Sequence, residues 1–372
     1  MIVSTTLVGP GTVDVLEDAL ASVRDQVDRC LVVLSDPELS DRDLVHAARR
    51  AGVKPAKLSL VRFAWIDDFS AARNFALEQA ALLGATWSVT VDTDERLHFD
   101  GVELRQVLGA TDVDLYLAMQ ADGSYAKERA FRLGKGWRWT GRTHESCPWS
   151  PGARRETLAG VTFSELAKSP EQLRAKFERD KLILLEETAG HARAENARAW
   201  YYLGECYHGL ADLESAVFAF TTCAEFSGWN EEAAWSRYRC ADLCCRLGGF
   251  DAAIEHAALG LTKHAGFGEL GWIAGIAAFR AGRFEQAIHW ATLSASVGWF
   301  SGTGRWVPRA GFRYPPALWE GPYDILAHAY EAIGEHEQAA RARARKRAAE
   351  KLRARTELGV LVDDDDSEPD AT

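Results

Sequence analysis

Signals that mark membrane and secreted proteins are missing from this sequence of 372 residues. It contains no run of about 18 apolar residues, which is the length that a membrane-spanning helix needs. Its first residues, Met1 to Ser4, carry neither the basic stretch nor the cleavage site of a signal peptide. We therefore expect a cytoplasmic protein with no membrane span.

Motifs for zinc, dinucleotides and P-loop phosphates are also absent. The sequence contains no Cys-x-x-Cys spacing, no Gly-x-Gly-x-x-Gly and no Walker A sequence. No motif therefore supports a zinc site, a dinucleotide site or a P-loop. The seven cysteines form an odd, scattered set, which indicates buried thiols in a reducing compartment. They are Cys30, Cys147, Cys206, Cys223, Cys240, Cys244 and Cys245.

An excess of basic residues is missing too. The formal net charge is −11, which argues against a nucleic-acid binder, because such proteins neutralise phosphates with lysine and arginine. A hydrophobic content of 47% in a chain of this length predicts real cores and two or three domains.

The first half of the sequence predicts strands and helices in alternation. Short β-branched runs predict strands, and apolar residues at helical spacing predict helices between them. This alternation implies a mostly parallel, doubly wound sheet, so we expect an α/β domain over residues 1–165. The expected strands are 2–8, 30–34, 58–61, 87–91 and 114–119, and the expected helices are 15–23, 41–50 and 68–83.

The strand at 87–91 ends in three carboxylates within four residues, Asp92, Asp94 and Glu95. Open α/β sheets bind ligands at this end of their strands. Carboxylates that project from one turn repel one another unless a cation lies between them, and Mg²⁺ and Mn²⁺ prefer oxygen donors. We therefore interpret the turn as a metal–diphosphate site, with Glu95 expected to cap a helix or support the site rather than bind the ion. The alternative is an Asp-rich turn that only caps the next helix.

A second informative stretch is the helix start around residue 70. Asp68 or Ser70 can cap the helix, whose first turns present Arg73 and Asn74 on one side. A helix N-terminus beside a guanidinium favours an anion, and the diphosphate of a sugar nucleotide would fit there. The alternative is an ordinary capped helix with a surface arginine.

The residues after 125 predict a wall over this site. Alternation at Arg129, Phe131 and Leu133 predicts an antiparallel edge strand, and Trp139 with Gly141 predicts a tight turn that closes over a pocket.

A histidine and a glutamate follow that wall. His144 supplies a nitrogen ligand and Glu145 a carboxylate. The alternative is that both have ordinary surface or core positions.

The second half is a helical repeat. Residues 166–198 are expected to hold a charged bridging helix, and the repeats to cover 199–355. A small residue recurs at spacings of 37, 34 and 52, and the motif Trp200-x-x-Leu203-Gly204-x-x-Tyr207 resembles the tetratricopeptide pattern. The recurring small residues are Ala216, Ala253, Ala287 and Ala339, and the apolar stripe expected to be buried on the bridging helix is Leu173, Phe177, Leu182, Leu184 and Leu185.

Two further segments of this half stand out. The last repeat spacing holds an insertion near 298–320 that is rich in Trp, Tyr, Arg and Gly, residues typical of contact surfaces. The alternative is a loop that only packs against the repeats. Residues 341–355 predict a basic capping helix, and 356–372 an acidic, disordered tail.

Four motifs together resemble those of family two, GT-A-fold glycosyltransferases. With the repeats, they resemble the bacterial branch that carries tetratricopeptide helices after the catalytic domain. That branch includes peptide glycosyltransferases acting on bacteriocin precursors and relatives of lipopolysaccharide-core glucosyltransferases. The motifs are Asp68-Phe69-Ser70-x-x-Arg73-Asn74, Trp87-x-x-x-x-Asp92-x-Asp94-Glu95, Arg129-x-Phe131-Arg132 and Trp139-x-Gly141-x-x-His144-Glu145.

The resemblance implies metal and donor contacts. It places Mn²⁺ or Mg²⁺ on Asp94, with Asp92 nearer the ribose or a metal-bound water, and it assigns His144 to the metal or the diphosphate. The acidic residue that contacts the base after the second strand corresponds to Asp36, although Leu34-Ser35-Asp36-Pro37 departs from the family's Asp-Thr-Gly-Ser pattern.

The function expected from this resemblance is inverting transfer of a sugar from a nucleotide diphosphate sugar, with UDP as the expected nucleotide. The acceptor would be a side chain of a peptide or protein held along the repeats, and the general base Glu145, with Asp122 and Glu128 as rivals. An envelope glycan or lipid-linked acceptor and an inactive repeat scaffold are the alternatives. Relatives can dimerise through their helical halves, so the resemblance also implies a homodimer.

Overall fold

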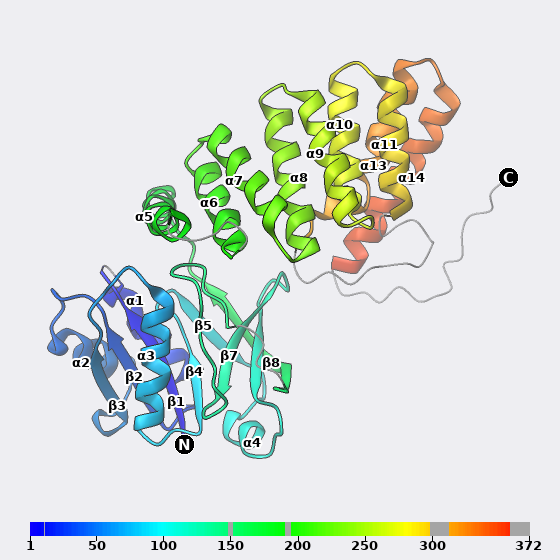
Figure 1. Ribbon diagram of the computed structural model, residues 1–372. Helices are drawn as coiled ribbons and strands as arrows, with labels where there is room; N and C mark the ends of the chain where they lie inside the picture. Colours follow the sequence, from blue (N-terminus) through cyan, green and yellow to red (C-terminus); the bar gives the residue numbers. More distant parts are fainter. Residues whose placement is uncertain (11, 148–151, 190–194, 298–311, 358–372) are drawn as a thin grey trace. The chain divides into compact units, whose positions relative to one another are not determined.

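The computed structural model describes residues 1–10, 12–147, 152–189, 195–297 and 312–357 (Figure 1). The chain divides into two compact units, Met1–Leu184 and Leu185–Thr372. Unit 1 contains a mixed, mostly parallel sheet and unit 2 is all-α, so the expected order of an α/β unit followed by helical repeats is confirmed. Within the described ranges, no helix is both long and apolar enough to cross a membrane.

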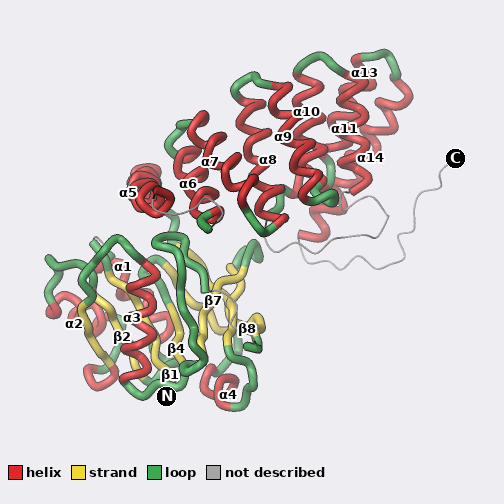
Figure 2. The backbone as a smooth tube through the Cα atoms, viewed as in Figure 1, coloured by secondary structure: helices red, strands yellow, loops and turns green. Residues whose placement is uncertain are grey.

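Unit 1 is built on one eight-stranded sheet with the order β3-β2-β1-β4-β7-β6-β8-β5 (Figure 1; Figure 2). Strand β1 pairs in parallel with β2 and β4, and β2 pairs in parallel with β3. Strand β7 joins β4 in the antiparallel sense. The strands are β1 Ile2–Val8, β2 Arg29–Leu34, β3 Leu58–Arg62, β4 Trp87–Thr90, β5 Glu95–Phe99, β6 Leu115–Gln120, β7 Ala126–Arg132 and β8 Arg155–Glu165.

Helices cover both faces of the parallel part of the sheet. Successive side chains of a strand point to opposite faces, so Val32 packs with α1 (Val13–Val23) and α2 (Asp41–Arg50), while Leu31 packs with α3 (Phe69–Leu82). A doubly wound sheet of this kind is buried on both faces. Its strand ends are therefore the places left for a ligand.

Two expectations about the antiparallel part of the sheet are wrong. Strand β7, which carries Arg129, was expected at an edge but lies between β4 and β6. After Asp94 the chain forms strand β5, paired with β8, so Glu95 does not cap a helix, which was one of the two roles expected of it. Alternating side chains mark a strand without specifying its neighbours, because those are chosen by residues distant in sequence.

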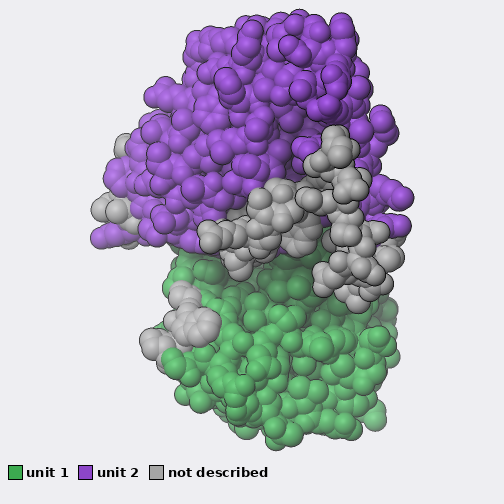
Figure 3. Space-filling model, turned by 90° about the vertical axis from the view of Figure 1, so that its right-hand side faces the viewer, with its two compact units in different colours: residues 1–184 green, residues 185–372 purple. Residues whose placement is uncertain are grey.

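Unit 2, coloured purple in Figure 3, stacks helices in pairs. The pairs are α6 with α7, α8 with α9, α10 with α11 and α13 with α14. The four recurring alanines are fully buried, as a tetratricopeptide-like repeat requires. The helices are α6 Ala197–Gly209, α7 Leu213–Phe226, α8 Asn230–Arg246, α9 Phe250–Lys263, α10 Gly268–Arg280, α11 Phe284–Val297, α12 Pro315–Leu318, α13 Gly321–Ala332 and α14 His336–Glu357; unit 1 also contains α4 Leu104–Gly109.

The bridging helix is α5 (Pro170–Ala189), and the division between the units falls within it. Its expected buried stripe is wrong for three leucines, because Leu173, Leu182 and Leu185 are exposed. Leu184 is buried, and so is the charged Asp180. Helical spacing of leucines predicts a buried face only where another element covers that face.

Parts of two expected segments lie outside the described residues. They are residues 298–311 of the aromatic insertion and residues 358–372 of the acidic tail. All seven cysteines are described, free and buried, as expected.

Candidate active site

The sheet of unit 1 has a topological switch point at β1. Strands β2 and β3 lie on one side of β1 and β4 lies on the other, so successive crossovers leave in opposite directions. Such a point opens a crevice at the carboxyl ends of the strands. Asp92 follows β4 and Asp36 follows β2, so both predicted binding residues come at this end of the sheet.

Arg73 of α3 joins two of the predicted acids. Its guanidinium donates to both carboxylate oxygens of Asp92, at 2.9 and 3.0 Å, and its Nε donates to Glu145. The guanidinium carbon also lies 5.1 Å from the ring centroid of Trp139. A bidentate pair fixes the orientation of both partners, and the aromatic ring adds a cation–π attraction.

Burial and charge oppose each other at this cluster. Burial alone would raise the pKa of Asp92, but Arg73, with Lys127 and Arg129 nearby, holds that pKa well below its ordinary value. Burial would likewise lower the pKa of Arg73, while Asp92 and Glu145 hold it well above its ordinary value. Asp92 and Arg73 therefore remain charged at neutral pH.

Asp68 and Asn74 hold the backbone around Arg73. Asp68 caps α3 by accepting the backbone N–H of Ala71 at 2.8 Å. Asn74 clamps Trp139, since its amide nitrogen donates to the Trp139 carbonyl at 3.0 Å and its oxygen accepts the Trp139 N–H at 2.9 Å. In this structure Asp68 and Asn74 position Arg73 and the wall beside it.

Asp94, the predicted principal metal ligand, is paired with a lysine that lies in none of the four motifs. The Nζ of Lys168 donates to Asp94 at 2.6 Å. About a third of each side chain is exposed, so the pair is accessible to a ligand. The partners are 74 positions apart in the sequence, so no local pattern indicates this contact.

Glu95 supports the turn that follows β4 through hydrogen bonds. It is buried, and its Oε1 accepts from Arg129 at 2.7 Å and from Lys127 at 2.8 Å. Its Oε2 accepts the backbone N–H of Asp92 at 3.1 Å. Glu95 therefore fixes the backbone that presents Asp92, which agrees with a supporting role and corrects the expected helix cap.

His144 has a left-handed backbone with φ of 51° and faces α5. Its Nε2 lies 3.4 Å from Oδ2 of Asp180, a fully buried carboxylate that also pairs with Lys176 and Arg179. Burial lowers the pKa of His144, and Asp180 only partly opposes that effect. Asp180 was not predicted as a site residue, because the expected buried face of this helix was defined by its apolar side chains.

The predicted metal ligands therefore have separate partners. Asp92 meets Arg73, Asp94 meets Lys168 and His144 meets Asp180. Across the described ranges, no three or more His, Cys, Asp or Glu side chains are grouped to hold a metal ion. Among the described residues, fewer than three such side chains come together here. Mg²⁺ is commonly held by one or two carboxylates when substrate phosphates and waters complete its coordination.

The remaining acids lie in ordinary local structures. Asp36 is buried and accepts the backbone N–H of Glu38 at 2.8 Å. Of the rival bases, Asp122 accepts the N–H of Ser124 in an exposed turn, and Glu128 pairs with Arg155 at 2.6 Å. Among the predicted bases, Glu145 is the one that shares a cation with Asp92.

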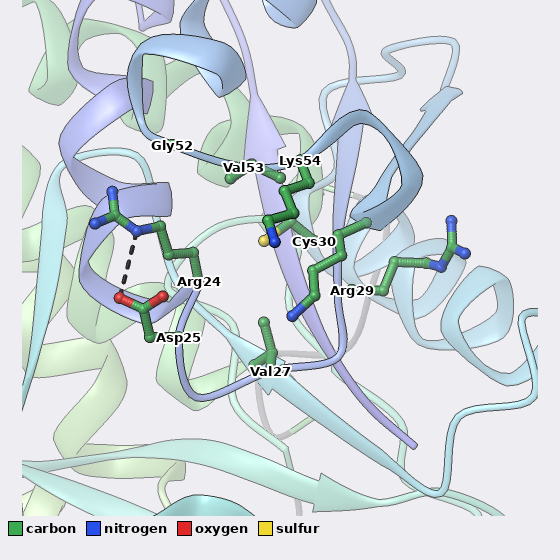
Figure 4. A pocket seen from close by; sticks show the side chains of 9 residues that line it. Arg24, Asp25, Val27, Arg29, Cys30, Gly52, Val53 and Lys54 are labelled. Carbon is green, nitrogen blue, oxygen red and sulfur yellow. Dashed lines mark ion pairs between the residues drawn. The ribbon is translucent and has the colours of Figure 1, made fainter.

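A hollow of about 150 Å³ lies at the opposite end of the sheet (Figure 4). Its walls include Lys54, Lys57 and Cys30, which stand at or before the amino ends of β2 and β3. Burial raises the pKa of the Cys30 thiol, so the sulfur stays protonated. This hollow is separate from the acidic turn.

Comparisons with known proteins concern the helical half. No protein-family model matches the sequence. Over 108 residues the chain is 37% identical to a TPR repeat-containing protein of Synechococcus elongatus, a match that covers 28% of this chain and about a quarter (24%) of that relative.

Among solved structures, MamA matches with a TM-score of 0.39 and 14% identity, covering 51% of this chain and 99% of MamA. A putative kinesin light chain of Podosopora anserina with TPR-like repeats matches with a TM-score of 0.38 and 14% identity, covering 50% and 90%. The chain is thus an α/β unit followed by tetratricopeptide-like repeats.

Proposed function

We propose that unit 1 is the catalytic unit of an inverting, metal-dependent glycosyltransferase. It would transfer a sugar from a nucleotide diphosphate sugar, with UDP as the nucleotide, to a side chain of a peptide or protein in the cytoplasm. What supports the proposal is the cluster of Arg73, Asp92 and Glu145 beside Trp139, at the end of the sheet where α/β proteins bind ligands.

The cluster suits charge stabilisation and proton transfer. In the proposed reaction, Arg73 neutralises charge on the departing diphosphate, and Glu145 takes the proton of the acceptor. A bound Mn²⁺ or Mg²⁺ would add Lewis-acid stabilisation of the leaving group. Asp94 would hold that ion, because its carboxylate is the more exposed of the two strand-end aspartates. Asp36 would contact the base.

The acceptor would be held by unit 2. Stacked helix pairs present long continuous surfaces, which suit an extended peptide or another protein. The match to a repeat-containing relative supports this use of the helical half.

Hydrolysis of UDP-sugars in the presence of Mn²⁺ tests the proposal. We expect Asp94→Asn, which keeps the side-chain shape and removes the charge, to lower turnover by about 100-fold or more, equivalent to a few kcal/mol of lost stabilisation. Asp25→Asn is the matched control, because Asp25 is exposed at the opposite end of the sheet. Equal turnover in both variants would contradict the role of Asp94.

A repeat scaffold with an inactive α/β unit is the competing function. The observation that favours it is that Asp92, Asp94 and His144 are each engaged by another side chain. Calorimetric titration with UDP, with and without Mn²⁺, separates the two functions. An enzyme should bind UDP more tightly with the metal, whereas absence of both turnover and metal-dependent binding across nucleotide sugars would establish the scaffold.

A further inference from the structure

A short segment of unit 2 lies against the first helices of three successive repeats. It is Phe312–Tyr314, which directly precedes α12, and its two rings contact residues of α6, α8 and α10 or the residue just before α8. Helices α8 and α10 lie side by side (Figure 1). We call this surface the aromatic face; it comprises Tyr201, Trp229, Glu231, Trp235, Tyr238, Glu269 and Trp272.

Phe312 lies among three rings of this face. Its centroid is 5.7 Å from that of Trp235, with ring planes 18° apart, and 5.4 Å from those of Tyr201 and Trp229. Such stacked and tilted arrangements are the favourable geometries of aromatic pairs. The surroundings of the first position of the segment therefore favour an aromatic side chain.

Tyr314 has a second set of rings. Its centroid lies 5.1 Å from that of Trp272 and 6.4 Å from that of Tyr238. Arg313 between them is exposed. Aromatic side chains two positions apart thus contact rings of successive repeats, and an exposed residue lies between them.

Two glutamates receive the backbone of the same segment. The N–H of Phe312 donates to Glu231 at 3.4 Å, and the N–H of Tyr314 donates to Glu269 at 3.2 Å. Each glutamate is the second residue of its helix, α8 or α10, and both are buried. Alternate N–H groups of an extended chain point the same way, so repeated carboxylates suit an extended peptide.

We propose that the aromatic face is a docking surface for an extended peptide segment of a partner protein with an aromatic-x-aromatic motif. The internal segment Phe312–Tyr314 occupies the surface in its place. Main-chain hydrogen bonds supply affinity in such recognition, and side-chain pockets supply specificity. Binding at this face is independent of sugar transfer; only the use of the bound peptide as acceptor rests on the proposed function.

A fluorescently labelled peptide Phe-Arg-Tyr-Pro-Pro, titrated into the full chain without nucleotide sugar, tests the inference. The natural chain should bind it weakly, because a tethered competitor acts at a high effective concentration. The double variant Phe312→Ala/Tyr314→Ala should bind it at least about tenfold more tightly. The peptide Ala-Arg-Ala-Pro-Pro should bind neither chain.

Substitutions in the aromatic face provide a second test of peptide binding. In the double-variant background, Trp235→Ala and Glu269→Gln should each weaken peptide binding by about tenfold or more. Phe226→Ala, which removes an exposed ring of α7, is the matched control and should leave binding unchanged.

Equal binding by the natural chain and the folded double variant, or no binding by either, would overturn the proposal. If the double variant does not fold, Tyr314→Ala alone removes a partly exposed ring and should give an intermediate gain. A folded single variant without any gain would also contradict the docking surface. Because no nucleotide sugar is present, this failure would leave the proposed transferase reaction standing.

Discussion

The two units hold buried acidic side chains in different surroundings. In unit 1, Glu95 and Asp180 meet arginine and lysine side chains in tight clusters. In unit 2, Glu231 and Glu269 accept backbone N–H groups next to aromatic rings. Ion pairs define one arrangement of particular side chains, whereas carboxylates that accept backbone groups can receive any chain of suitable shape.

We infer from this difference that the two units have different roles. The charged cluster of unit 1 is preorganised, as a site that stabilises developing charge should be. The aromatic face of unit 2 is suited to exchange between occupants of like chemistry. Three substitutions, one in unit 1 and two in unit 2, test the charge and packing of the two units.

The largest expected effect follows Arg73→Ala. The change leaves Asp92 and Glu145 partly buried without their shared cation, and loss of one partner of such a cluster costs about 3 kcal/mol of unfolding free energy. Urea unfolding measures this loss. Arg62→Ala, which breaks an exposed pair with Asp41, should cost less than about 1 kcal/mol. Similar costs for both variants would remove the distinction drawn for unit 1.

A smaller effect is expected from Gly204→Ala in α6. A Cβ at this position would lie 2.7 Å from the ring of Phe220, so the helix pair would have to separate. Overpacking costs about 1–3 kcal/mol, which outweighs the gain of about 1 kcal/mol in helix propensity. Gly109→Ala, at the end of α4 with open space around it, is the control. A natural or raised melting temperature for Gly204→Ala would show that the repeat packing tolerates adjustment.

The smallest effect concerns pH and His256 of α9. Burial and the neighbouring Arg237 lower the pKa of His256 to about 4, below the value of about 6.5 in an unfolded chain. The unfolded chain therefore binds the proton first, and stability should fall as pH drops from about 6.5 towards 4.

We expect a loss on the order of 1 kcal/mol by pH 5, allowing for the solvent that reaches the ring. His256→Gln should flatten this part of the stability profile, measured by urea unfolding at several pH values. An unchanged slope would assign the acid sensitivity to other groups.

Patterns of short range in the sequence predicted most of the fold. The parallel strands up to β4, the buried cysteines and the recurring alanines of the repeats are confirmed, because side-chain periodicity and small-residue spacing are local properties. The neighbours of β7, the strand β5 and the exposed leucines of α5 were not predicted. Each of these three features depends on which element, distant in sequence, packs against the strand or helix concerned.

The same division holds at the candidate site. The sequence by itself placed Asp92 at the carboxyl end of a strand, the end at which α/β sheets bind ligands, and the resemblance predicted that Arg73 and Glu145 serve the same site. Only the tertiary structure decided that Arg73 joins the two acids, that Lys168 meets Asp94 and that Asp180 meets His144. Ion pairs form between whichever charges the folded chain brings within a few ångströms, and that proximity is set by packing rather than by spacing along the chain.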